Sequence, residues 1–390
     1  MIRLADRMDC TGCSACRSAC PASCISMRQD AEGFLYPEID AGRCVSCGLC
    51  VKACPELNPV SKKSPSAVFA AWAQDGEQRA ASASGGVFYA LGKKVIGDGG
   101  VVCGAILDEG GVRHICTDRL PELGKMRGSK YVQSRLDDCF REIAGYLKDG
   151  RNVFFSGTPC QVAGLRSCLG EGLQEHLLTA EIVCHGVPSK TLFDRYLDDL
   201  HGKYGPFPAA SFRFRRTDCW TTDLSSTIVT EEGTRSLRRR DCAFMALYQS
   251  DWVFRESCYR CKHAGTERTA DLTLGDFWGL KGTGVPESTL EAGCSLILVH
   301  TGKGRSFLES VSDSLFLQER ASAEAFRSNA GLSGPSPRPR IRTDIYRRVE
   351  RQGLGSLRLL AACRKAFLPA YQALHHQLHL IKKALCRKSA

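Results

Sequence analysis

Several familiar motifs are missing from this 390-residue sequence, and each absence excludes a class of protein. No Gly-x-Gly-x-x-Gly follows a predicted strand and no Walker P-loop occurs, which argues against a Rossmann nicotinamide site and an ATP site. No stretch approaches the ~20 apolar residues of a membrane span. Residues 1–20 lack a basic region followed by an apolar stretch, so we expect no signal peptide and a cytoplasmic location.

Acidic residues are scarce only at the C-terminal end. Residues 335–390 hold 13 Lys or Arg against Asp344 and Glu350, a net charge of +11, which equals the net charge of the whole chain. The other 334 residues are therefore neutral overall, with 40 basic and 40 acidic side chains. Since no motif of a nucleic-acid reader accompanies this basic tail, we expect no nucleic-acid partner.

Cysteine is abundant, with 22 residues, and eight of them repeat one spacing. Each copy reads Cys-x2-Cys-x2-Cys-x3-Cys-Pro, and the second copy follows the first at an offset of 34 residues. The eight residues are Cys10, Cys13, Cys16 and Cys20, then Cys44, Cys47, Cys50 and Cys54. This run is the one by which bacterial ferredoxins bind 4Fe–4S clusters.

The fourth cysteine of each run ligates the other cluster in the two-cluster arrangement. The prediction is therefore one cluster on Cys10, Cys13, Cys16 and Cys54, and a second on Cys44, Cys47, Cys50 and Cys20. A disulfide scaffold would need an oxidising compartment. Zinc sites use paired Cys-x2-Cys hooks without a triple run. We therefore expect two clusters and a protein through which electrons pass.

The remaining sequence divides by composition and pattern. Residues 1–57 form the expected two-cluster ferredoxin domain, and residues 58–66, rich in Pro, Ser and Lys, read as a linker. Strand and helix patterns alternate through residues 67–334, as in α/β folds, and residues 335–390 form a basic helical tail. The predicted fold is therefore α+β, a ferredoxin-like domain followed by an α/β domain. Strands are expected at residues 68–72, 101–107, 152–155, 177–183, 210–214, 225–230, 270–274 and 295–300.

Four further cysteines lie where this α/β pattern turns: Cys160, Cys184, Cys258 and Cys261. From the residues alone they fit either a third 4Fe–4S cluster or unreactive buried thiols beside a redox or zinc hook. Cys103, Cys116, Cys139, Cys168, Cys219, Cys242 and Cys294 have no companion spacing and read as small core residues.

Two glycine turns open helices, Ser84-Gly85-Gly86 and Ser156-Gly157-Thr158. Backbone N–H groups at such turns hold phosphates in many proteins, although most turns of this kind are only turns.

Six motifs in order then resemble one known family over roughly residues 1–315. They are Ser84–Phe88, Gly128–Ser134, Ser156–Gln161, Cys184–Ser189, Cys258–Cys261 and Gly275–Gly279. The chain resembles the coenzyme F-420 (deazaflavin) hydrogenase/dehydrogenase beta-subunit family, here with a fused two-cluster ferredoxin domain. The resemblance implies an FAD-containing flavoprotein in which residues 67–334 bind FAD and iron–sulfur.

Roles follow from the resemblance motif by motif. Cys160, Cys184, Cys258 and Cys261 become ligands of a third 4Fe–4S cluster. The expected FAD contacts are Ser84, Gly85, Gly86, Lys130, Tyr131, Ser134, Ser156, Gly157 and Thr158. Lys130 would stabilise the reduced flavin, and His185 would either relay protons or simply bond the backbone. Asp276, Phe277 and Trp278 would shape the substrate side, or in the case of the two aromatic residues pack in the core.

The resulting hypothesis is a ferredoxin-dependent FAD and iron–sulfur oxidoreductase acting on an organic small molecule. The alternatives are a non-catalytic electron-transfer subunit and a redox sensor. The fused ferredoxin domain suggests soluble ferredoxin or another redox protein as partner, and makes use of the deazaflavin coenzyme doubtful. The tail folds onto the catalytic domain in one interpretation; in the other it makes peripheral contact with the inner face of the membrane through a basic amphipathic helix.

Overall fold

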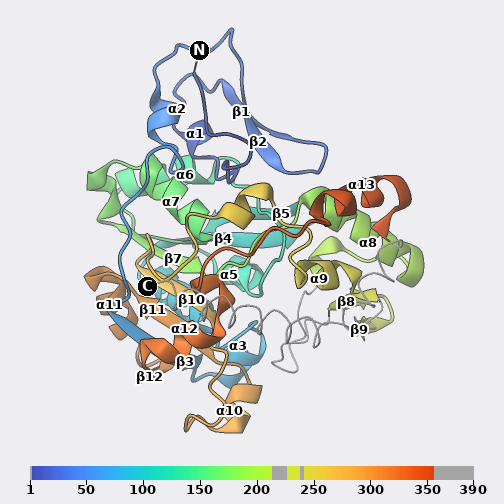
Figure 1. Ribbon diagram of the computed structural model, residues 1–390. Helices are drawn as coiled ribbons and strands as arrows, with labels where there is room; N and C mark the ends of the chain where they lie inside the picture. The colour runs from blue at the N-terminus through green and yellow to red at the C-terminus, as the bar shows by residue number, and fades with distance from the viewer. Residues whose placement is uncertain (1, 213–225, 238–240, 355–390) are drawn as a thin grey trace, which may run out of the picture.

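The computed structural model describes residues 2–212, 226–237 and 241–354 (Figure 1). Most of the predicted tail, residues 355–390, lies outside these ranges, as does the end of the strand expected at residues 210–214. The part of that strand that is described forms a 3₁₀ turn, Ala209–Ser211, so the strand prediction was wrong there. In the described ranges no helix is both long and apolar enough to span a membrane.

The N-terminal module stands at the top of Figure 1 and repeats one unit twice. Each unit has a one-turn helix, α1 (Ala15–Ser18) or α2 (Leu49–Lys52), and the two helices keep the 34-residue offset of the cysteine runs. Between them an antiparallel hairpin pairs β1 (Ile25–Gln29) with β2 (Leu35–Ile39). The linker then leads down to the main domain, where Ser66 joins the sheet by donating its backbone N–H to the Val299 carbonyl.

The main domain is built on an eight-stranded sheet with the order β12-β3-β11-β10-β7-β6-β4-β5. Its strands are β3 (Ala67–Ala73), β4 (Val101–Asp108), β5 (Gly111–Thr117), β6 (Val153–Gly157), β7 (Leu177–Ile182), β10 (Leu272–Asp276), β11 (Ser295–Val299) and β12 (Leu315–Glu319). All five residues of β6 and of β11 are buried, as expected of central strands covered on both faces. The sequence pattern located six of these strands but did not predict β5 or β12.

Strand direction determines where a ligand can bind. β4, β6, β7 and β10 run parallel to one another, and β3 shares their direction because β11 is antiparallel to both β3 and β10. Their carboxyl ends therefore meet at one edge of the sheet, the place where open α/β sheets bind ligands.

Helices cover both faces of the sheet (Figure 1). One face packs α4 (Val87–Gly97), α5 (Leu120–Met126) and α11 (Gly302–Glu309), and the other packs α6 (Cys139–Lys148), α7 (Pro159–Cys168) and α12 (Ser322–Ser328). α6 shows why these segments are helical, since Phe140, Ile143 and Leu147 recur every three or four residues and are all buried. Two short helices, α3 (Gly76–Ala80) and α10 (Glu287–Glu291), lie at the periphery.

A third group of elements packs beside β5 and carries its own apolar core. It contains α8 (Lys190–Tyr204), β8 (Thr227–Thr230), β9 (Gly233–Ser236), α9 (Ala243–Tyr248) and α13 (Arg342–Gln352). α13 is the described part of the basic tail, and its Ile345 and Val349 are buried in this core. Arg342 is 1% exposed and pairs with Glu32 of the N-terminal module, so this part of the tail folds onto the protein. Membrane contact through residues 355–390 stays a prediction.

Hydrogen bonds from arginine fix the N-terminal module on the main domain. Arg141 of α6 donates to the carbonyls of Arg17, Ser18 and Cys20 at 3.0 to 3.3 Å. Buried Arg255 donates from Nε to the Cys10 carbonyl at 2.8 Å. An arginine on a buried carbonyl makes a charge-assisted bond, so the two parts are held in one relative position.

Candidate functional site

The two cysteine runs of the module share an unusual backbone. Residues at equivalent positions take left-handed φ angles, namely Gly12 at 69° and Ser14 at 62°, and Ser46 at 53° and Gly48 at 74°. Alternation of left- and right-handed residues turns successive N–H groups toward one point and makes a concave nest for an anion, as in many iron–sulfur sites. The backbone therefore fits two anionic thiolate clusters. The left-handed conformation of Ser14 and Ser46 was not predicted from the sequence, in which only the repeat marks these positions.

The second predicted ligand set surrounds one cavity. Cys20, Cys44, Cys47 and Cys50 line about 300 Å³ of empty space together with apolar side chains such as Ile39. A ninth cysteine of the module lines it too, because the Cys24 sulfur lies 3.3 Å from that of Cys20. Sequence analysis missed Cys24, which lies outside the repeated run.

The first predicted set, Cys10, Cys13, Cys16 and Cys54, lies on the side of the module that faces α7. Burial raises the pKa of Cys16, and the neighbouring Cys10 and Cys54 thiolates raise it further. Cys13 is buried against α7, where a Cβ on Gly164 would come within 2.9 Å of its sulfur. Thiols that hinder one another's ionisation become favourable ligands once iron supplies positive charge.

The four cysteines of the main domain meet in one cavity of about 700 Å³. Cys160 starts α7, Cys184 follows β7, and Cys258 and Cys261 come from the 3₁₀ turn Glu256–Arg260 and its end. Burial raises the pKa of Cys160 to about 12, and the Cys261 charge adds to the effect. Burial likewise raises the pKa of Cys258 to about 12.

No three of these four sulfurs lie within 4.8 Å of one another. Tetrahedral zinc with Zn–S bonds of about 2.3 Å holds its sulfurs about 3.8 Å apart. In the described ranges the one group of three or more ligand side chains with all donor atoms within 4.8 Å is Cys103, Cys116 and Cys139. None of the twelve predicted cluster cysteines belongs to such a group.

A second and larger cavity adjoins this one at the carboxyl edge of the sheet. It encloses about 1400 Å³ of empty space, part of it open to solvent. The predicted flavin contacts that line it are Ser84, Gly86, Lys130, Tyr131, Ser134, Ser156, Gly157 and Thr158, and His185 lines it as well. The structure thus brings together residues that are up to about 100 positions apart in the sequence.

Gly85 and Gly86 are each required by the shape of their turn. A Cβ on Gly85 would lie 2.3 Å from the Ala71 carbonyl oxygen, and Gly86 has a φ of 84°. Gly86 is the N-cap of α4 and offers no side chain, so the first N–H groups of this 11-residue helix are not capped from that position. An uncapped helix N-terminus in a cavity is suited to a phosphate.

The turn before α7 differs, because its own side chains occupy it. The Gln161 Oε1 accepts from the Thr158 N–H at 3.0 Å, and the Thr158 hydroxyl lies 3.2 Å from the Cys160 sulfur. Gln161 also donates to the Ser134 hydroxyl at 2.9 Å. This turn therefore connects the two cavities and is less suited to phosphate than the turn before α4.

Lys130 has a structural task. Its ammonium donates to the carbonyls of Lys125, Met126 and Arg127 at 2.8 to 3.1 Å, which caps the C-terminus of α5. Cations stabilise that end of a helix. The side chain lines the larger cavity, yet these three bonds occupy the three ammonium hydrogens, so the predicted role at the flavin competes with the cap.

His185 is held by a carboxylate. Its Nε2 lies 2.8 Å from Asp251 Oδ1, and its ring packs edge-on against Phe254. His185 lines both cavities, and its ring centroid lies 6.1 Å from that of Tyr248. The alternative to a proton-relay role was a bond from His185 to the backbone, but the partner in the structure is the Asp251 carboxylate. A carboxylate fixes the ring tautomer of a histidine that handles protons.

The larger cavity has a second histidine, which sequence analysis did not consider. His114 of β5 is 5% exposed and its Nε2 lies 3.1 Å from the Ser156 carbonyl oxygen. Burial lowers the pKa of His114 to about 4, so the ring is neutral near pH 7. Since a carbonyl only accepts, Nε2 carries the proton. Of the predicted substrate-side residues, Asp276 lines the cavity, whereas Phe277 is 1% exposed and packs in the core.

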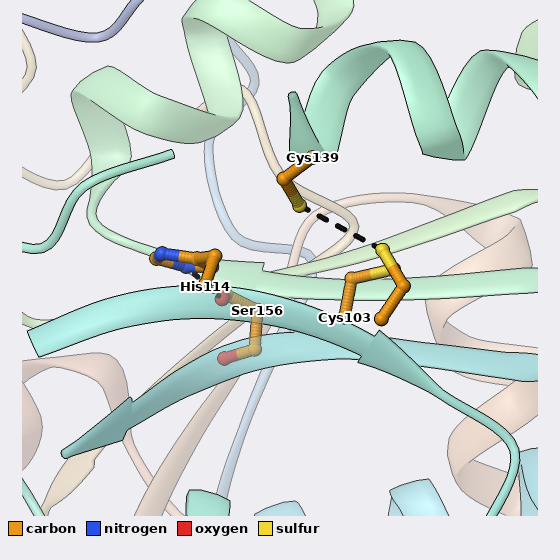
Figure 2. The surroundings of a disulfide bond; sticks show 5 residues. Cys103, His114, Cys139 and Ser156 are labelled. Atoms are coloured by element: carbon orange, nitrogen blue, oxygen red, sulfur yellow. Dashed lines mark hydrogen bonds between the residues drawn. A yellow bond between two sulfur atoms is a disulfide. The ribbon is translucent and has the colours of Figure 1, made fainter. Parts of the chain in front are cut away.

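Behind His114 lies a cluster of three sulfurs that the sequence did not predict (Figure 2). Cys103 and Cys116 face each other across β4 and β5 and form a disulfide, and the Cys139 sulfur is 3.7 Å from that of Cys116. All three lie in or against the apolar core under α6, as expected. The pairing of Cys103 with Cys116 was not predicted, because strand register brings together residues that are 13 positions apart.

Two protein-family profiles match separate stretches of this chain. Residues 150–324 match the profile for the C-terminal part of the coenzyme F420 hydrogenase/dehydrogenase beta subunit, and residues 9–57 match the 4Fe–4S dicluster domain. A solved structure that resembles this fold is the F420-reducing NiFe hydrogenase complex from Methanosarcina barkeri, at 17% identity and a TM-score of 0.47 over 66% of this chain and 82% of that chain.

Three curated relatives match over short stretches of 51 to 59 residues. NADH-quinone oxidoreductase subunit I of Pelobacter propionicus is 42% identical over 13% of this chain and 31% of its own length. Subunit I 2 of the same enzyme from Geobacter metallireducens is 45% identical over 12% of this chain and 39% of its own. Ketoisovalerate oxidoreductase subunit VorC of Methanothermobacter marburgensis is 33% identical over 14% of this chain and 72% of its own.

The chain thus spans only about a third of the length of the first two relatives. The two family profiles concern separate stretches and together account for both cysteine-rich regions of the chain. The chain belongs to the coenzyme F420 hydrogenase/dehydrogenase beta-subunit family of iron–sulfur electron-transfer oxidoreductases, and carries a 4Fe–4S dicluster domain at its N-terminus.

Proposed function

We propose that this protein is an iron–sulfur flavoenzyme that passes electrons between ferredoxin-type clusters and FAD, for the reduction or oxidation of a small organic substrate. In this proposal residues 1–57 bind two clusters, and residues 67–334 bind a third cluster, FAD and the substrate. Bound clusters would carry single electrons, and bound flavin would exchange them for the electron pair of a hydride.

The observation that carries the proposal is the wall shared by the two cavities of the main domain. Both cavities are lined by Ser134, Thr158, Gln161, Cys184, His185, Gly186 and Val187. A cluster on the four cysteines and a ligand at the sheet edge would thus be separated by little more than single side chains. Such proximity is what electron transfer between two cofactors needs.

The chain also links the third site to the dicluster module. Cys160 and Gly164 lie one turn apart on α7, so the helix that supplies a third-site cysteine also packs on Cys13. On a second path His263, two residues after Cys261, is 2.8 Å from Glu56, two residues after Cys54. These contacts support a sequence of sites from the module through α7 to the sheet edge.

The residues of the larger cavity would each have a defined task. The turn Ser84–Gly86 and the α4 N-terminus would hold FAD phosphate. Tyr131, whose ring is tilted against that of Tyr248 with the centroids 4.7 Å apart, would flank the ring system. His185, oriented by Asp251, would hold or give up the proton that accompanies hydride transfer. Asp276 on the cavity wall is the candidate contact for substrate.

A non-catalytic electron-transfer subunit is the second candidate, favoured by one finding. All three curated relatives are named as subunits of larger oxidoreductases. In that case the protein would relay electrons through its clusters without binding a small substrate, and a partner enzyme would supply the chemistry.

Anaerobically isolated protein tests the proposal. We expect flavin bands in the visible spectrum and FAD in the supernatant after denaturation. The variant Cys184→Ser should keep flavin and both module clusters, but its flavin should be reduced far more slowly when electrons are supplied to the module. Flavin-free protein with full iron content would instead support the subunit alternative, and flavin reduction at the wild-type rate in the variant would refute the proposed path.

A further inference from the structure

The two cluster loops have the same backbone, but only one of them is covered. In the first loop Ala15 is fully buried, Cys13 is 9% exposed, and a Cβ on Gly12 would lie 2.7 Å from Gln133 of the main domain. The first loop therefore lies against the domain that contains the third predicted cluster site.

The equivalent face of the second loop, 34 residues later, is open. Leu49 is 42% exposed where Ala15 is buried, Val45 is 68% exposed where Thr11 contacts Gln133, and Cys47 is the exposed equivalent of Cys13. A Cβ on Gly48 would meet nothing within 4 Å. The more apolar of the two faces is thus the one left uncovered, the reverse of what a solvent-facing loop requires.

The charges at the rim of the two faces are also reversed. Asp9 of the first loop pairs with Arg260 of the main domain at 2.7 Å. The equivalent residue of the second loop is Arg43, which is exposed, and Lys52 stands exposed beyond Leu49 in place of Ser18. Neither Arg43 nor Lys52 has a carboxylate within ion-pair distance in the part of the chain that the structure describes. The main domain presents a positive charge to the first loop, whereas the second loop would attract a partner that presents negative charge.

We propose that Arg43, Val45, Cys47, Leu49 and Lys52 form the docking face for an acidic one-electron carrier protein. This inference rests on the proposed function, because it identifies where electrons enter or leave the predicted chain of sites. In each encounter the carrier loses one electron and this protein gains one, or the reverse, and no bond forms or breaks. Weak electron-transfer complexes are small, so an apolar centre of two side chains with a basic rim is sufficient.

The test compares a protein donor with a small one. Full-length, iron-loaded protein is mixed anaerobically with reduced flavodoxin, an acidic carrier, or with methyl viologen radical, and bleaching of the cluster absorbance is followed in a stopped-flow instrument. We expect Arg43→Glu and Lys52→Glu each to lower the second-order rate constant with flavodoxin about tenfold at low salt, and Val45→Glu to do the same at any salt. The wild-type rate should fall as salt is raised.

Rates with methyl viologen should be unchanged, because a small donor needs no docking face. Val229→Glu is the matched control, since Val229 is 45% exposed on the distant hairpin β8–β9. Equal flavodoxin rates in all variants would overturn the proposal, and so would an equal loss with viologen, which would locate the effect at the cluster itself. The readout needs neither flavin nor substrate, so failure here is distinguishable from failure of the proposed function.

Discussion

Replacing Gly164 by alanine tests whether α7 lies directly against the first cluster of the module. In a helix interior this change normally stabilises by about 1 kcal/mol. Here the new Cβ would lie 2.9 Å from the sulfur and 3.1 Å from the Cβ of Cys13, closer than side chains tolerate. Cys13 cannot move away if it is held by a cluster, so the contact costs about 1–3 kcal/mol.

Gly145 of α6 supplies the matched control. A Cβ on Gly145 would meet nothing within 4 Å, so Gly145→Ala should receive the helix-propensity gain alone. The difference in stability between the two variants then isolates the contact with Cys13. We expect Gly145→Ala to be more stable than wild type and Gly164→Ala to be less stable, with a difference of about 1–3 kcal/mol between the variants.

Anaerobic thermal unfolding, with iron determined on the same samples, measures both effects. Gly164→Ala should also lose iron, because the easiest relief of the contact is displacement of Cys13. If Gly164→Ala unfolds at the temperature of Gly145→Ala and retains all its iron, α7 does not lie against the first cluster as described here.

Three further outcomes follow. Burial lowers the pKa of His300 to about 4, below the usual 6.5, so the unfolded chain binds the proton first as pH falls. The free energy of unfolding should therefore decrease as pH falls from 6.5 toward 4, by about 2 kcal/mol at pH 5. In unfolding curves measured over this pH range, His300→Gln should reduce the dependence of stability on pH. Arg141→Ala removes three hydrogen bonds to the module, and proteolysis in linker residues 58–66 should become severalfold faster. Arg151→Ala, which removes hydrogen bonds to Gly99 and Asp118 within the main domain, should leave the proteolysis rate unchanged. Asp251→Asn should lower turnover about tenfold and shift its pH profile without changing iron or flavin content, because His185 loses its orienting carboxylate; an unshifted profile would remove His185 from proton handling.

Most of what could be predicted about the candidate site came from the cysteine spacing. Local spacing predicts the two cluster loops, because the first three cysteines of each run lie close together in the sequence. Only the fourth cysteine of each run is assigned to the other cluster. The apolar pattern also located six of the eight sheet strands, since central strands such as β6 and β11 are continuous apolar runs. β5 was missed because its Arg113 and His114 break the apolar pattern.

Features that depend on distant pairing could not be predicted in the same way. The Cys103–Cys116 disulfide follows from strand register, and the pairing of His185 with Asp251 depends on how a loop 66 residues away returns to the site. Lys130 illustrates the opposite error, since a conspicuous lysine in a motif donates to carbonyls only three to five residues before it. Backbone capping competes with a catalytic role and leaves no mark in the spacing.

Iron and acid-labile sulfide per chain, measured on anaerobically isolated protein, test the central claim most directly. Three 4Fe–4S clusters predict about twelve irons and twelve sulfides per chain. The variant Cys258→Ser should contain about eight of each, since only the third site is lost. A metal-free chain with its cysteines paired as disulfides, or zinc in place of iron, would contradict the account.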